Sequence, residues 1–520
     1  MNYRLTNKVK EFAHELGADL VGVANIERFE NAPIMMSPQG ILPSAKSVVV
    51  CAIHHPDACI ELGGEPEPQD IGPYKIQYVM NDKMDVIAYK VGRMLDDLGY
   101  KTVPIASSNI WRYRGYKDLE ADFAPDISHI YASVAAGLSQ MGWNGLAITP
   151  EYGARNRYIS IITEAELEPT PLYDGPDLCD MCGECINNCP TNAFRKEVDG
   201  VKKIEIEDKE YEFANKNLWR CAWGEHFDLD LNLDIPDKVD EEVILNHVKE
   251  HGLRGGEFGV CLRVCLPPHL RYEDPDYTRV FRRKRHVEPT DIPVHRSVID
   301  KVTSIATDNQ LDELVFLSES QLEEMGVTVK EFLPDGQSAI LLAASYQLPE
   351  KDGLSEDKYQ DIVNDYKSIA SFNLDFAVLD ISRELEKLGY TAIPKTDIDD
   401  FKLAENSVLK NVLDDEGEWL FETVITSAKM SSEYKEIGKG TILKDKDLNA
   451  DNLTEISKDY GADLIGVTSV DRLNGVVEQI REVKEGERIF DVNDKNIRFK
   501  EFNPEVTENK RKLFYPGDYL

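Results

Sequence analysis

Four cysteines near the middle of the sequence have the spacing of ligands to an iron–sulfur cluster. They form the run Cys179-x2-Cys182-x2-Cys185-x3-Cys189, followed by Pro190, which is the spacing of a bacterial ferredoxin half-site. In such a run the first three thiolates bind one cubane from a tight loop, and the fourth ligates a second cluster. A zinc ribbon would instead need two cysteine pairs separated by a longer spacer. The run therefore predicts an electron-transfer site.

A second group of cysteines follows, one thiolate short of a regular half-site. Cys261-x3-Cys265 matches the end of another ferredoxin run, whereas its earlier cysteine positions hold Phe258 and Gly255. Cys221 is the nearest substitute, and a buried thiol without a ligand role is the alternative for it.

The crossed arrangement of two-cluster ferredoxins predicts which cysteines share a cluster. The first set has four members: Cys179, Cys182, Cys185 and Cys265. The second set has three members: Cys189, Cys221 and Cys261. The second cluster is then either a three-iron 3Fe–4S cluster or a 4Fe–4S cluster with another ligand, for which the candidates are His226, His251 and Cys59.

The composition is that of a strongly acidic globular chain. Its 520 residues predict two or three domains. Asp and Glu number 95 against 59 Lys and Arg, for a net charge of −36, and such a field repels phosphate backbones, so no nucleic-acid partner is expected. The basic run RRKRH at 282–286 is expected to be a solvated linker. No apolar stretch reaches the roughly 18 residues of a membrane helix, and the first residues lack a signal core, so a cytoplasmic location without disulfides is expected.

The residues before the cysteine run alternate between helix and strand patterns, which predicts an α/β region. Helices are expected at 6–16, 77–98 and 127–141 from their three-to-four spacing of apolar residues. Strands are expected at 20–24, 47–53, 101–107, 146–153 and 158–165.

The same segments return in the second half of the chain. LPSAKSVVVCAIHHP at 42–56 is echoed at 333–349, and LDDLGYKTVPI at 95–105 is echoed at 385–395. This spacing predicts an internal duplication whose second copy has no cysteine.

A third echo complicates the start of the second copy. SKDYGADLIGVTSVDRL at 457–473 copies residues 14–29, whereas residues 297–320 match them only weakly. The late segment is therefore expected to supply a first element to the second sheet or to cap it.

Several stretches resemble, in the same order, the superfamily of epoxyqueuosine reductases and reductive dehalogenases, and are closer to the dehalogenase-like members. They are GADLVGVANIERF at 17–29, the stretch from DFAPDISH to ELEPTP at 122–171, and the cysteine run. The resemblance covers residues 10–270. It implies an α/β (α+β) protein with a nitroreductase-like corrinoid-binding domain at 1–170 and a ferredoxin-like module with two clusters at 171–290. Residues 291–520 are then a degenerate repeat of the first domain with a C-terminal tail.

The resemblance also names candidate catalytic residues. Asp122 stands where epoxyqueuosine reductases keep an acidic proton donor, and its alternative role is a helix N-cap. His129 stands where those enzymes keep an arginine, which argues against the same substrate. Tyr113 and Tyr116 are candidates for the tyrosine proton donor of the dehalogenases, since neighbouring basic residues would lower a tyrosine pKa.

The expected cofactor contacts are two arginines. Arg155 and Arg157 lie where the superfamily has an arginine near the corrinoid or substrate, and ion pairs with carboxylates are the alternative. His54 and His55 follow a predicted strand, and either line the same pocket or are structural.

These features together predict an anaerobic, cytoplasmic reductase that depends on cobalamin and iron–sulfur clusters. Ferredoxin or flavodoxin would donate low-potential electrons, and a small molecule would lose a halogen or a similar group at cobalt. The alternatives are a non-catalytic electron-transfer subunit, tRNA modification of the epoxyqueuosine reductase type, and a flavin in place of the corrinoid. The duplication predicts a monomer with an internal pseudo-dimer, or a homodimer.

Overall fold

A computed structural model describes most of the chain before residue 438. The described residues are 2–64, 72–108, 123–196, 200–227, 229–252, 259–284, 294–346, 348, 351, 355–411, 418–437, 453, 457 and 465. The chain divides into the units Met1–Ile437 and Gly438–Leu520. Helices and strands are mixed throughout the first unit, as the sequence predicts. None of the helices in the described ranges is both long and apolar enough to cross a membrane.

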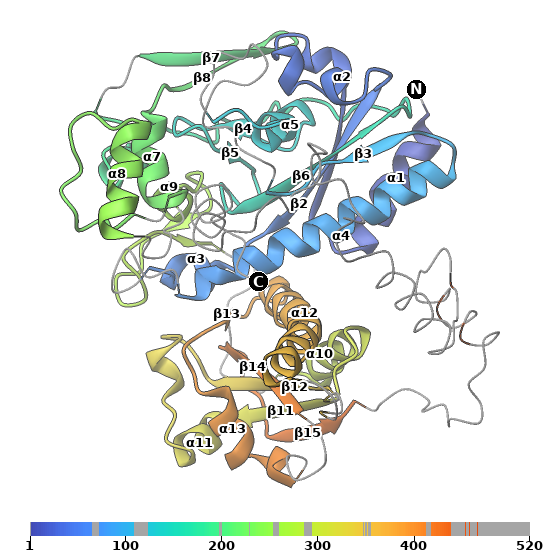
Figure 1. Ribbon diagram of the computed structural model, residues 1–520, viewed down its shortest axis with the longest axis vertical. Coiled ribbons are helices and arrows are strands. Elements are labelled where there is room, and N and C mark those ends of the chain that lie inside the picture. Colours follow the sequence, from blue (N-terminus) through green and yellow to red (C-terminus); the bar gives the residue numbers. More distant parts are fainter. Residues whose placement is uncertain are drawn as a thin grey trace, which may run out of the picture. The chain divides into compact units, whose positions relative to one another are not determined.

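An antiparallel sheet organises the N-terminal region. Its strand order is β1-β2-β6-β3, with bounds Leu20–Asn25, Ser47–His54, Asn156–Thr163 and Thr102–Pro104. Helices α1 (Tyr3–Glu15) and α4 (Ile76–Asp97) pack on one face and α5 (His129–Ala135) on the other (Figure 1). The shorter elements are α2 (Pro38–Ile41), α3 (Asp57–Leu62), β4 (Gln140–Met141) and β5 (Ala147–Ile148).

Strand β2 is buried along its whole length because helices cover both faces of the sheet. Val49 and Cys51 pack with α1 and α4, whereas Val48 and Val50 pack with α5. This alternation follows from the two-residue period of a strand. The buried strand that the continuous apolar run predicts is therefore confirmed.

The predicted helix at 127–141 is shorter in the structure. Helix α5 ends because Gly137 adopts a φ of 72°, which favours glycine, and an added Cβ there would lie 2.0 Å from the carbonyl oxygen of Pro171. The chain then enters the short strand β4, which pairs with β5.

The cysteine region is built from short elements. They are α6 (Glu184–Asn187), β7 (Val201–Ile206), β8 (Lys209–Ala214), α7 (Leu218–Glu225), α8 (Glu241–His251), α9 (Val260–Val264), β9 (Arg271–Tyr272) and β10 (Arg282–Arg283). The prediction that the basic run at 282–286 is a solvated linker is wrong for its first two residues. Both side chains are only 12% exposed, because Arg282 pairs with Asp274 and Arg283 pairs with Asp57.

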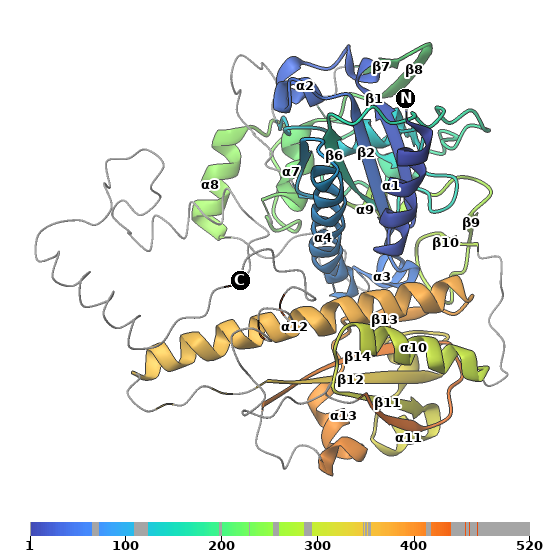
Figure 2. The same ribbon diagram turned by 90° about the vertical axis from the view of Figure 1, so that its right-hand side faces the viewer.

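A second antiparallel sheet follows, with strand order β13-β14-β12-β11-β15. The strands are β11 (Glu313–Ser318), β12 (Ser338–Tyr346), β13 (Ala392–Pro394), β14 (Glu418–Thr426) and β15 (Glu433–Glu436). The helices are α10 (Arg296–Asp308), α11 (Glu319–Glu324), α12 (Glu356–Lys387) and α13 (Asp400–Asn406). Figure 2 shows the length of α12, which packs on its own sheet and also contacts α4.

The two sheets repeat each other down to single hydrogen bonds. Apart from β15, the order β11-β12-β14-β13 corresponds to β1-β2-β6-β3. Before each first strand an aspartate accepts a bond from the backbone N–H at the end of the second strand: Asp19 from His54 at 2.9 Å, and Asp312 from Ser345 at 2.6 Å. Such matching contacts are what an internal duplication produces.

The first elements of the second copy come from residues 296–318. Helix α10 and strand β11 take the places of α1 and β1, so the segment that matched only weakly in sequence begins the copy. The late segment 457–473, which was expected to supply this element, lies outside the described residues except for Ser457 and Ile465.

Candidate iron–sulfur centres

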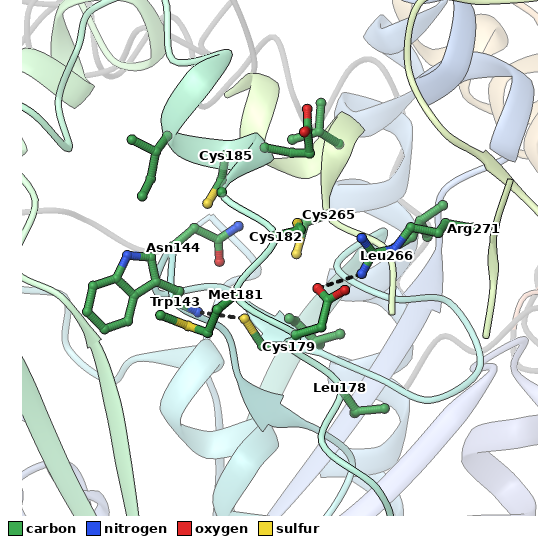
Figure 3. Close-up of a pocket in the computed structure, with 16 residues that line it drawn as sticks. Trp143, Asn144, Leu178, Cys179, Met181, Cys182, Cys185, Cys265, Leu266 and Arg271 are labelled. Atoms are coloured by element: carbon green, nitrogen blue, oxygen red, sulfur yellow. Dashed lines mark hydrogen bonds and ion pairs between the residues drawn. The ribbon is translucent and has the colours of Figure 1, made fainter. Parts of the chain in front are cut away.

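Four cysteine side chains line one cavity of about 60 Å³. Cys179 and Cys182 lie in the loop before α6, Cys185 lies in α6, and Cys265 directly follows α9. Figure 3 shows these labelled side chains pointing toward one space. The cavity exceeds the roughly 10–15 Å³ that one water molecule needs. In the described part of the chain, no three His, Cys, Asp or Glu side chains lie close enough together to share a single metal ion.

Backbone conformation turns these thiols inward. Met181 has a φ of 58° and Gly183 a φ of 81°, so the chain reverses tightly between the cysteines. The backbone N–H of Trp143 donates to Cys179 Sγ at 3.5 Å. Asn144 Oδ1 accepts from the Leu146 N–H at 3.0 Å, which leaves the buried Nδ2 donors of this cavity-lining side chain without a protein acceptor. Donors of this kind stabilise charge on cluster sulfurs.

Three further cysteines line a second cavity of about 40 Å³. Cys189 lies just after α6, Cys221 on α7 and Cys261 on α9. Lys216 and Glu225 also line this cavity. The two cavities therefore hold the two crossed sets of cysteines that the spacing predicts.

Local bonds fix α7 beside Cys189. The Asn217 side chain caps the helix by accepting the Arg220 N–H at 2.8 Å. Arg220 is buried, and its Nε donates to the Thr191 carbonyl oxygen at 2.6 Å. Because Cys221 follows Arg220, this bond brings Cys221 to the segment that carries Cys189.

The three candidates for a fourth ligand do not line the second cavity. His226 packs against the rings of Phe123 and Phe227. His251 lies at the exposed end of α8. Cys59 is fully buried in α3, where burial raises its thiol pKa well above the ordinary value.

Burial keeps several of these thiols protonated in the absence of a metal. It raises the pKa of Cys265 to about 12 and that of Cys185 to about 11, with neighbouring cysteines adding to both shifts. It also raises the pKa of Cys221 to about 11, although the Lys216 ammonium opposes the shift. Iron binding must therefore release protons from these thiols.

Arg155 lies in a buried ionic network rather than at either cysteine cavity. One guanidinium nitrogen donates to Asp57 Oδ1 at 3.1 Å and Glu61 Oε1 at 2.7 Å. The other donates to the carbonyl oxygens of Arg263 at 3.2 Å and Phe281 at 2.7 Å. These bonds give Arg155 a structural role, and its expected contact with a cofactor stays a prediction.

His129 has both ring nitrogens within hydrogen-bond distance of protein atoms. Nδ1 lies 2.9 Å from Ser160 Oγ and Nε2 lies 2.9 Å from the Ala106 carbonyl oxygen. Burial lowers its pKa to about 4, so the ring is neutral near pH 7. Its expected catalytic role is untested.

Arg157 is more accessible than Arg155. Its Nε donates to Asn81 Oδ1 at 2.9 Å, and a terminal nitrogen lies 3.5 Å from the Ser107 carbonyl oxygen. The predicted proton donors lie outside the described residues: they are Asp122, Tyr113 and Tyr116. The structure therefore brings the cysteines together but does not test the proton donors.

His54 and His55 are both buried, and their surroundings shift their pKa values in opposite directions. His54 Nδ1 lies 2.7 Å from Asp19 Oδ2, and Nε2 lies 3.2 Å from Glu386 Oε2. Burial opposes the charge on His54, but the two carboxylates outweigh it and raise its pKa. His55 bonds Gln77 Oε1 at 3.0 Å, and burial lowers its pKa to about 3.

Sequence analysis missed several polar side chains at the cavities, among them Asn144, Lys216 and Glu225. Only Glu225 had a usable signal, because it follows Cys221 by four residues in a helical pattern and so shares its face.

Residues 173–195 match the family model of the 4Fe–4S binding domain. Over 142 residues the chain is 30% identical to a tetrachloroethene reductive dehalogenase of Desulfitobacterium hafniense, covering 27% of this chain and 22% of the relative. Over 245 residues it is 26% identical to an epoxyqueuosine reductase of Leadbetterella byssophila, covering 39% of this chain and 71% of the relative. The chain thus spans only about a fifth of that dehalogenase.

Solved structures of both kinds of protein are also similar to parts of the chain. An epoxyqueuosine reductase with an epoxyqueuosine-modified tRNA-Tyr stem loop is 20% identical, with a TM-score of 0.27 over 36% of this chain and 52% of the other. A catabolic reductive dehalogenase is 11% identical, with a TM-score of 0.27 over 83% of this chain and 61% of the other.

Proposed function

We propose that the chain, which is similar in sequence to epoxyqueuosine reductases and reductive dehalogenases, is a reductase whose two iron–sulfur clusters carry electrons to a reducing site in residues 1–170. The grouping of seven cysteines around two cavities carries this proposal. The match of residues 173–195 to a 4Fe–4S binding domain supports it. The relatives are themselves named as reductases.

The two clusters would be close neighbours. Cys185 and Cys189 are four residues apart but line different cavities, and the same holds for Cys261 and Cys265. The same two short segments, 185–189 and 261–265, therefore contribute a cysteine to each cavity. Such proximity suits electron transfer from one cluster to the next.

The finer proposal is a dehalogenase-like enzyme with a corrinoid at the reducing site. The superfamily resemblance supports a corrinoid, which would supply a low-valent cobalt when bound. Of the two arginines predicted to contact it, Arg155 is buried and donates to protein atoms through both terminal nitrogens, so Arg155 does not fit a cofactor contact. The proposal includes ferredoxin or flavodoxin as the donor, a small-molecule substrate and a cytoplasmic location.

Reduction of epoxyqueuosine in tRNA is the second candidate, since the relative with that name is covered over 71% of its length. The net charge of −36 opposes binding of nucleic acid. A non-catalytic electron carrier is the remaining alternative.

The test uses anaerobically purified full-length protein mixed with cobalamin and a low-potential reductant. Retained cobalt and chloride release from tetrachloroethene would support the dehalogenase-like proposal. Conversion of an epoxyqueuosine-containing tRNA stem loop would support the second candidate. Intact clusters without retained cobalt, and without either reaction, would contradict both enzymes and leave the electron carrier.

A further inference from the structure

We propose that the carboxylate of Glu225 is the fourth protein ligand of a 4Fe–4S cluster in the second cavity. This inference rests on the proposed function, in which Cys189, Cys221 and Cys261 hold that cluster. The first cavity has four cysteines, whereas the second has three cysteines and Glu225 among its lining residues.

Helix α7 places Glu225 one turn after Cys221, on the same face of the helix. Glu225 Oε2 lies 3.7 Å from Cys221 Sγ. The carboxylate is therefore directed to the same side of the cavity as a thiol that the spacing pattern marks as a ligand.

Gly259 places the same oxygen near a second thiol. A Cβ added to Gly259 would lie 3.3 Å from Glu225 Oε2 and 3.2 Å from Cys261 Sγ. Both atoms thus approach one point in front of the Gly259 backbone. A larger residue at position 259 would crowd them, so glycine keeps this corner open.

The other polar side chains that line this cavity are less suited to bind iron. Lys216 carries an ammonium group, which has three donors and no acceptor. The hydroxyl of Thr191 lies 3.6 Å from Cys189 Sγ and is neutral. A carboxylate is an established iron ligand in proteins, and the Lys216 ammonium would balance its charge.

The test measures iron and sulfide in the full chain after anaerobic cluster reconstitution, and records EPR spectra of the oxidised protein. The wild type is expected to hold about eight irons as two 4Fe–4S clusters. Glu225→Ala is expected to lose about one iron and to show the EPR signal of an oxidised three-iron cluster. Glu225→Cys is expected to restore about eight irons, because a thiolate replaces the carboxylate.

Glu242→Ala is the matched control, since Glu242 is an exposed glutamate in the first turn of α8. It should keep about eight irons and the wild-type spectrum. Thermal unfolding of each variant, and the retained signal of the first cluster after reduction, separate ligand loss from misfolding.

Three results would overturn the proposal in distinguishable ways. A Glu225→Ala protein with wild-type iron and spectrum would exclude Glu225 as a ligand while leaving both clusters in place. A wild type that already shows the three-iron signal would mean that no fourth ligand binds. A wild type with about four irons would contradict the second cluster itself, and with it the proposed function of this cavity.

Discussion

The first sheet and the second sheet share their strand order but differ in the residues at the strand ends. Strand β2 ends at His54, and the register places Ser345 at the corresponding position of β12. Arg157 of β6 corresponds in the same way to Leu420 of β14. The second copy has thus kept the apolar strands that build a core while lacking the polar groups of the first.

The second copy instead supports the first. Glu386 on α12 is buried and contacts His54, whereas the corresponding Asp96 on α4 is exposed. Arg383 on α12 is buried and donates to Asp19 at 2.6 Å, whereas the corresponding Arg93 on α4 is partly exposed and forms an ion pair with Asp97 at 4.0 Å. The two helix positions are therefore buried in α12, whereas the corresponding positions in α4 are exposed to solvent.

The largest expected effect concerns iron. Cys265→Ser removes the one thiol of the first cavity that lies outside the cysteine run at 179–189. The substitution should disrupt the first cluster, with loss of up to about four irons. Cys51→Ala is the control, because Cys51 packs in the core of β2 and lines neither cavity. The same iron content in both variants would exclude the first cavity as the site of a cluster.

A smaller effect is expected at the contact between the copies. Glu386→Ala leaves His54 with one buried carboxylate fewer and removes an acceptor of the Asp57 N–H, which should lower the unfolding free energy by about 3–5 kcal/mol. Asp96→Ala, at the corresponding exposed position, should change it by less than about 0.5 kcal/mol. Anaerobic urea unfolding followed by tryptophan fluorescence measures both variants, and equal effects would contradict the asymmetry.

The same contact should make stability depend on pH. The pKa of His54 is raised above 6.5, so its contribution is complete below pH 6.5 and is lost as the pH rises through the folded-state pKa. Burial would raise the pKa of Asp19, but Arg383 and His54 lower it well below 3.8, so its contribution is lost only in acid. Unfolding midpoints should therefore fall above pH 6.5 in the wild type and fall less in His54→Gln.

The smallest effect is expected within the second copy. Asp312→Ala removes the bond to the Ser345 N–H, which should cost about 0.5–1.5 kcal/mol. Asp19→Ala should cost more, because Asp19 also pairs with His54 and Arg383. Reversal of this order in urea unfolding would mean that the second copy, rather than the first, depends on this aspartate.

Much of the first copy could be predicted from local sequence. The apolar run of β2 predicts its burial, and the short spacings among Cys179, Cys182 and Cys185 predict a tight loop. Arg155 could not be assigned in this way, because its partners Asp57 and Glu61 lie about a hundred residues earlier in the chain. Partners chosen by tertiary packing leave no periodic pattern in a single sequence.

The start of the second copy shows a different limit. Residues 313–318 form the expected first strand although their sequence has diverged from GADLVGV, because a buried strand constrains hydrophobicity more than residue identity. A search for residue identity therefore favoured the late segment 457–473, although β11 already holds the first-strand position.

The most direct test of the two-cluster account is the metal and sulfide content of the wild-type chain, purified without oxygen and measured together with zinc. Two clusters predict about eight irons with a similar amount of acid-labile sulfide, and no stoichiometric zinc. Zinc in place of iron, or iron without sulfide, would contradict the assignment of both cavities as iron–sulfur centres.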